Sequence, residues 1–174
     1  MFLLKLLVLV LSLAIFVEDI LSRSVHWFLF PLLYLALFAV NYFQSHNWID
    51  GLQHSLWNSL FIAFQLGILT LYFSIKKKKI INITDGLLGW GDILFWVCIS
   101  CFFSPVIFLL YYIGSLIFVL LIWGAVSLFS NKTNRHIPLA GLQALVFALL
   151  FVIAWFKPAV KLGSDEWIIN KMFF

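Results

Sequence analysis

Residues 105–130 read PVIFLLYYIGSLIFVLLIWGAVSLFS and contain no charged side chain. A helix that crosses the roughly 30 Å hydrocarbon core of a bilayer needs about 20 apolar residues, and this stretch exceeds that length. A helix that is apolar on all of its faces is stable in lipid rather than on the surface of a soluble domain. The stretch therefore predicts a transmembrane helix.

The pattern recurs along the chain, because polar clusters or helix breakers separate a series of apolar stretches. The chain of 174 residues is 64% hydrophobic and 10% charged, with a mean hydropathy of +1.10, whereas soluble domains are about 45–50% apolar and about 25% charged. The sequence predicts an all-α, polytopic integral membrane protein with about six transmembrane helices and no room for a soluble domain. The candidate spans are residues 2–18, 25–44, 52–75, 87–103, 105–130 and 137–156.

The two ends of the chain carry separate expectations. The first apolar stretch resembles a signal peptide, but it has one charge, Lys5, and no small-residue cleavage site before Glu18, so we expect a retained first helix. Residues 1–157 then form the membrane core. Residues 158–174 mix charges with aromatic residues and predict a short amphipathic tail at the membrane surface.

The basic residues predict the orientation. The first, third and fifth loops contain seven of them, and the second and fourth loops contain none. Since Lys and Arg accumulate on the cytoplasmic side, the odd loops are expected in the cytoplasm and both termini outside. The seven are Arg23, Lys76 to Lys79, Lys132 and Arg135. Because they lie at helix ends and form no patch, they indicate contact with lipid phosphates and no nucleic-acid partner.

Several kinds of site find no support in the sequence. Cys98 and Cys101 lie inside an apolar run without a second cysteine pair or a neighbouring histidine, so packing against another helix is favoured over redox or metal chemistry. The four histidines show no metal-ligand spacing, and no GxSxG or HExxH motif occurs. We therefore expect neither a metal nor a cofactor.

Acidic residues gather at the predicted cytoplasmic ends of the helices. Asp19 closes the first helix, next to Glu18, and Asp92 lies about one turn into the fourth helix, after Asp85. A carboxylate near hydrocarbon is costly, so it normally faces protein or water and marks a function, although an acid near a helix N-terminus also favours the helix dipole. Asp92 follows Gly89-Trp90-Gly91 in a GxGD motif, where two glycines permit close approach beside the acid.

These segments resemble the type IV prepilin peptidase family of membrane aspartic proteases over nearly the whole chain. The first helix ends in Val17-Glu18-Asp19 before a basic stretch, Gly89-Trp90-Gly91-Asp92 is similar to the family's GxGD, and His136-Ile137-Pro138-Leu139 resembles the opening of the family's last core helix. The resemblance implies that Asp19 and Asp92 are the catalytic pair, supported by Gly89 and Gly91.

The resemblance also implies a substrate and a location. The substrate is a pilin-like precursor whose short basic leader is removed just before an apolar helix, at the cytoplasmic face of the cell inner (cytoplasmic) membrane. Glu18 and Asp85 are the candidates for binding basic residues of the leader. Large members of the family also methylate the new N-terminus and carry a cysteine-rich loop; this chain has no such loop, which implies a minimal core without methyltransferase activity.

Other functions remain open at this point. Leu94 stands where the family usually has a lysine, and the Gly-Pro that follows the family's Ile-Pro is absent, which favours a catalytically inactive relative acting as a membrane assembly or scaffold protein. A presenilin-type protease shares GxGD but also needs a Tyr-Asp pair, which the chain lacks. A transporter or channel needs polar residues along a path, whereas Asn58, Gln65 and Gln143 look isolated.

Overall fold

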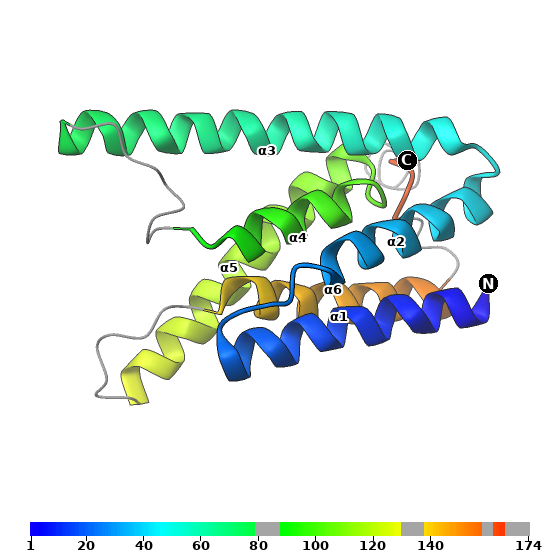
Figure 1. Ribbon diagram of the computed structural model, residues 1–174, viewed down its shortest axis with the longest axis horizontal. Coiled ribbons are helices and arrows are strands. Elements are labelled where there is room, and N and C mark those ends of the chain that lie inside the picture. The colour runs from blue at the N-terminus through cyan, green and yellow to red at the C-terminus, as the bar shows by residue number, and fades with distance from the viewer. Residues whose placement is uncertain (79–87, 130–137, 158–161, 166–174) are drawn as a thin grey trace, which may run out of the picture.

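A computed structural model describes residues 1–78, 88–129, 138–157 and 162–165 (Figure 1). Within these ranges all regular secondary structure is helical, which confirms the all-α fold class. The elements are α1 (Phe2–Ser22), α2 (Leu29–Ser45), α3 (Trp48–Lys77), α4 (Trp90–Ser100), α5 (Pro105–Phe129) and α6 (Leu139–Phe156).

The helices differ in their capacity to cross a membrane. Three of those described, α3, α5 and α6, are long and apolar enough to do so. The α1 helix has 21 residues but carries Lys5, Glu18 and Asp19, while α2 and α4 are apolar but shorter, with 17 and 11 residues. At about 1.5 Å per residue, α4 is only about 16 Å long. The predicted span at 87–103 is therefore a short helix, and the count of six spans stays a prediction.

The helices pack around a core that is rich in aromatic side chains. The α1 helix packs against both α2 and α6, and α4 contacts α2, α3 and α6. Phe147 of α6 is fully buried and packs edge-to-face against Phe95 of α4 and Phe103, with ring centroids 6.3 and 5.7 Å apart. Such pairs add about 0.5–1.5 kcal/mol to the burial of the rings. The core thus fixes α6 against α4, the two helices whose N-termini form the candidate site.

The turn between α4 and α5 is buried in the bundle and is stabilised by two asparagines. The Asn58 side-chain amide donates to the carbonyls of Ser100 and Phe103, both at 2.8 Å, and the Asn41 amide donates to the carbonyl of Cys101 at 2.8 Å. Non-helical backbone at membrane depth is tolerated where protein satisfies its polar groups. Asn58, which looked isolated in the sequence, therefore stabilises the end of the short helix.

Replacing Asn58 with alanine is expected to destabilise the protein by about 2–4 kcal/mol, because two buried carbonyls lose their donor. Thr70→Ala on the same helix is the matched control, since Thr70 donates to the carbonyl of Leu66 within α3, at 2.7 Å. We expect Thr70→Ala to change stability by less than about 1 kcal/mol. Thermal unfolding of the purified proteins checks this; equal melting temperatures for the two variants would contradict it.

The remaining expectations on packing concern the cysteines and the tail. Cys98 and Cys101 are buried free thiols, and the Cys98 thiol donates to the carbonyl of Phe30 at 3.0 Å, as expected for packing residues. Of the predicted tail, only residues 162–165 are described. The Ser104 amide donates to the Leu162 carbonyl at 3.0 Å, and the Ser104 hydroxyl donates to Asp165 at 2.5 Å. Asp165 is therefore bound to the bundle.

Candidate active site

The C-terminal end of α1 and the N-terminal ends of α4 and α6 meet at one end of the bundle (Figure 1). The α1 helix ends at Arg23, whose left-handed backbone (φ 53°) lets its amide donate to the Asp19 carbonyl at 3.0 Å. The α4 helix begins after Gly89, which has an extended backbone. These local boundaries bring Asp19 and Asp92, 73 positions apart in the sequence, to the same end of the bundle.

Asp92 stabilises the start of its own helix. Its Oδ2 accepts a hydrogen bond from the Gly89 backbone amide at 3.0 Å, and its own amide donates to the Gly89 carbonyl at 3.1 Å. An acid in the first helical turn also interacts favourably with the helix dipole. Asp92 therefore occupies the position that favours the helix dipole. It also has neighbours on other helices.

The N-terminus of α6 presents backbone amides to both of the two acids. The Gly141 backbone amide donates to Asp19 Oδ2 at 2.6 Å, and the preceding amide, that of Ala140, interacts favourably with the Asp92 carboxylate. These amides belong to the first turn of a helix, where backbone N–H groups have no partner within the helix. Adjacent residues of one helix therefore connect α1 and α4 through their carboxylates.

The approach of α1 to α6 requires a glycine at position 141. A Cβ added to Gly141 would lie 2.9 Å from Asp19 Cβ, 3.0 Å from its Oδ2 and 3.2 Å from the Phe16 carbonyl oxygen. A Cβ on Gly89 would lie 3.2 Å from Asp92 Oδ2, whereas one on Gly91 would make ordinary contacts of 3.8 and 3.9 Å. The tightest glycine of the site is thus in α6 and not in the GxGD motif.

The two carboxyl groups are close enough for their charges to interact. Asp19 and Asp92 are each only 9% exposed, so access to them is narrow. Two carboxyl groups in one site resist simultaneous ionisation and titrate as a pair. A pair of this kind can hold one proton and so present one acid and one base, which is the arrangement that hydrolysis of an amide requires.

The predicted leader-binding residues have different surroundings. Glu18 accepts hydrogen bonds at 2.9 Å from the His26 backbone amide, through Oε2, and pairs with His26 Nδ1, through Oε1, also at 2.9 Å. Both of its oxygens are thus occupied by the α1–α2 loop, although the side chain is 30% exposed. Asp85 lies outside the described residues, as do His136 and Ile137.

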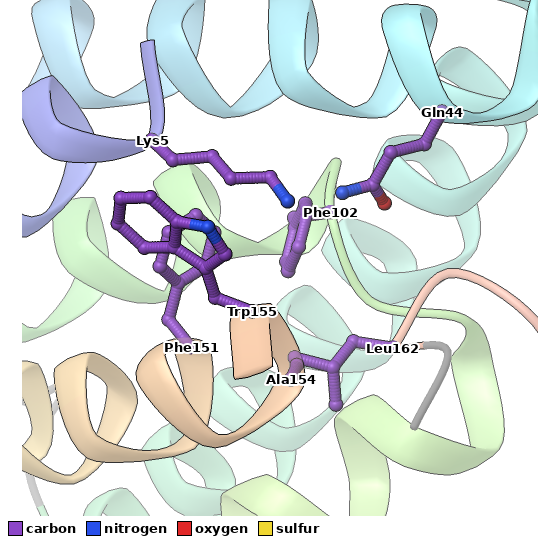
Figure 2. A pocket seen from close by; sticks show the side chains of 7 residues that line it. All are labelled: Lys5, Gln44, Phe102, Phe151, Ala154, Trp155 and Leu162. Atoms are coloured by element: carbon purple, nitrogen blue, oxygen red, sulfur yellow. The ribbon is translucent and has the colours of Figure 1, made fainter. Parts of the chain in front are cut away.

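Two further features of the described residues bear on metal and ligand binding. No group of three or more His, Cys, Asp or Glu side chains in the described part of the chain could hold a metal ion. A small pocket is lined by Lys5, Gln44 and Trp155 among others, and the Lys5 ammonium lies 5.6 Å from the centre of the Trp155 ring (Figure 2). These residues lie at the opposite end of the bundle from Asp19, so the pocket is separate from the carboxylates.

Sequence reasoning missed the part that α6 plays. The amides of Ala140 and Gly141 belong to the backbone and leave no signature in residue type, but Gly141 is a glycine directly after the Ile-Pro-Leu-Ala opening of an apolar helix. Comparison of the chain with family models, with curated proteins and with solved structures gave no match.

Proposed function

We propose that the protein is a membrane-embedded aspartic endopeptidase that removes the short basic leader of pilin-like precursors. One observation carries the proposal: two carboxyl groups from different helices, Asp19 and Asp92, converge at one end of the bundle, where they interact with adjacent amides of α6. Burying two acids is energetically costly, so a buried pair of this kind normally marks a functional site. The GxGD motif and the resemblance of the flanking segments to prepilin peptidases name the reaction class.

Hydrolysis at this site follows the chemistry of a shared proton. The ionised carboxylate takes a proton from a water molecule, whose oxygen attacks the carbonyl carbon of the scissile peptide, while the protonated carboxyl donates to the carbonyl oxygen. The tetrahedral intermediate collapses, the C–N bond breaks and the amine leaves with a proton. The products are the leader with a new carboxylate and the remaining chain with a new amine. We assign no fixed role to Asp19 or Asp92, since the pair titrates jointly.

The amides of α6 support this chemistry by fixing positions. Donors at a helix N-terminus favour negative charge, so Ala140 and Gly141 keep one net charge in the pair stable away from bulk water. The bond from Gly141 and the contact with Ala140 also position the two carboxyl groups relative to each other. Correct placement of catalytic groups accounts for a large part of the rate enhancement by enzymes.

The proposal places the site at the cytoplasmic face of a cytoplasmic membrane, with both termini outside. The charge pattern of the loops supports this orientation, because the loop after α1 carries Arg23 and the end of α3 carries Lys76 to Lys78. The ends of α1 and α3 and the starts of α4 and α6 then share one side. A precursor with a cytoplasmic leader would meet the carboxylates there.

Co-expression with a panel of pilin-like precursors tests the proposed function. In cells without other prepilin peptidases, the protein is expected to shorten at least one precursor at a bond just before its apolar helix, and mass spectrometry of the product identifies the bond. The double variant Asp19→Asn/Asp92→Asn at equal membrane abundance is the control. A panel that stays full length with the unaltered protein would favour the alternative, an inactive relative with an assembly or scaffold role.

A further inference from the structure

A buried polar cluster links α4, α5 and α6 close to the carboxylates. Gln143 is completely buried, and its side-chain oxygen accepts a hydrogen bond of 2.6 Å from the Trp96 indole N–H. Its side-chain amide lies 3.4 Å from the Ser115 hydroxyl, and its backbone carbonyl accepts from the Tyr111 hydroxyl at 2.7 Å. Gln143, which looked isolated in the sequence, is thus bonded at both its side chain and its backbone.

The spacing of these residues relates the cluster to the candidate site. Trp96 lies four residues after Asp92 on α4, and Gln143 lies three residues after Ala140 on α6. Residues three and four apart lie on the same face of a helix, one turn from each other. The Trp96–Gln143 bond therefore joins the same two helix faces as the contact between Asp92 and the Ala140 amide, about one turn deeper in the bundle.

The Trp96–Gln143 bond restricts the sliding and rotation of α6 on α4, which the apolar core alone permits. Apolar side chains tolerate small sliding and rotation of one helix on another, whereas a buried hydrogen bond between two side chains specifies one register. If α6 rotated or shifted along α4, the Trp96 indole N–H and the Gln143 side-chain oxygen would both be left unsatisfied in the core, which is costly. The register that satisfies them is the register that places the α6 amides on the carboxylates.

We propose that Gln143 is a positioning residue for the Asp19–Asp92 pair, acting through its bond to Trp96 to set the register of α6 against α4. The expected effect of Gln143 on catalysis rests on the proposed function. Its expected effect on the register of α6 against α4 rests on the structure alone. Gln143 does not contact the carboxylates, so its effect reaches them through the placement of the Ala140 and Gly141 amides.

The catalytic consequence is tested with three variants. Gln143→Met keeps the length of the side chain but removes the acceptor, and is expected to lower kcat of precursor cleavage about 10–100-fold with little change in KM, because misplacement of catalytic groups by about 1 Å has effects of this size. Gln143→Glu, protonated in its buried site, retains an acceptor and a donor and should restore most of kcat. Tyr111→Phe removes the α5–α6 bond to the backbone of the same residue and should leave kcat within about threefold.

The geometric consequence is tested without activity. In a Cys98→Ala/Cys101→Ala background, cysteines are introduced by Gly91→Cys and Ala140→Cys, since a Cβ on Gly91 would lie 3.9 Å from Ala140 Cβ, close to the mean of about 3.8 Å in disulfides. Mild oxidation in membranes is expected to form the disulfide rapidly. Adding Gln143→Met should slow its formation about tenfold, and adding Tyr111→Phe should not.

The two readouts separate the failure of this inference from the failure of the proposed function. If no precursor is cleaved but the disulfide forms and depends on Gln143, the proposed function fails and the positioning role stands. The positioning role is overturned if the disulfide does not form, if Gln143→Met leaves its rate unchanged, or if Gln143→Met and Tyr111→Phe lower kcat equally.

Discussion

Changing either Asp19 or Asp92 to asparagine is expected to reduce precursor cleavage by at least about 10³-fold, the scale seen when one member of a catalytic group is removed. An amide can neither take a proton from water nor donate one to the scissile carbonyl, so a site with one carboxyl group lacks one half of the reaction. Because the pair acts as a unit, the double variant should be about as inactive as each single variant. The rate of leader release at equal protein abundance is the measurement.

The same variants are expected to fold. Asparagine retains an oxygen that can accept from the Gly141 or Ala140 amide, and removing one of two interacting acids relieves repulsion between them. Melting temperatures at or above that of the unaltered protein are therefore expected, as is common when strain at a functional site is relieved. A melting temperature well below that of the unaltered protein would contradict this expectation. The loss of activity would then be explained by misfolding.

Replacing Gly141 with alanine is expected to have the second largest effect. The new Cβ would lie 2.9 Å from Asp19 Cβ and 3.2 Å from the Phe16 carbonyl oxygen, so α1 has to move away from α6 by several tenths of an ångström. That movement lengthens the 2.6 Å bond from the Gly141 amide to Asp19. We expect a loss of about 10–100-fold in kcat and of about 1–3 kcal/mol in stability, the usual cost of overpacking.

Gly114→Ala is the matched control for this substitution. Gly114 also lies in an apolar helix, but a Cβ there meets no atom within 4 Å. Alanine at that position should leave both the rate and the melting temperature nearly unchanged, or raise the latter slightly through its higher helix propensity. Equal effects of the two substitutions on activity would show that close packing at Gly141 does not hold the carboxylate pair.

Much of the fold could be predicted, because a helix that suits a lipid environment is recognisable from a continuous stretch of apolar residues. Polar clusters and breakers separate the apolar stretches, and the structure begins α5 at Pro105 and ends α2 at Ser45, close to the predicted positions. The placement of Asp19 and Asp92 at one end of the bundle could also be predicted, because successive helices alternate in direction and both acids lie next to loops of the same parity.

The departures arise from contacts between segments far apart in the sequence. The apolar run up to the break at Ser104-Pro105 predicts a longer helix at 87–103. Only the folded chain brings Asn41 and Asn58 to the carbonyls of the turn that follows Ser100, where α4 ends. Gln143 gave no signal for the same reason, since its partner Trp96 lies 47 residues away. Hydropathy indicates which stretches are apolar enough to be buried in lipid or protein. It does not indicate which hydrogen-bond partner each of the few buried polar side chains will have.

Cleavage of a pilin-like precursor by the purified protein in lipid nanodiscs tests the central claim most directly, because other peptidases are then absent. We expect the unaltered protein to release the leader at a single bond before the apolar helix, and Asp19→Asn and Asp92→Asn each to abolish the release. Release that persists in either variant would contradict the assignment of a shared pair of carboxylates at the N-terminus of α6.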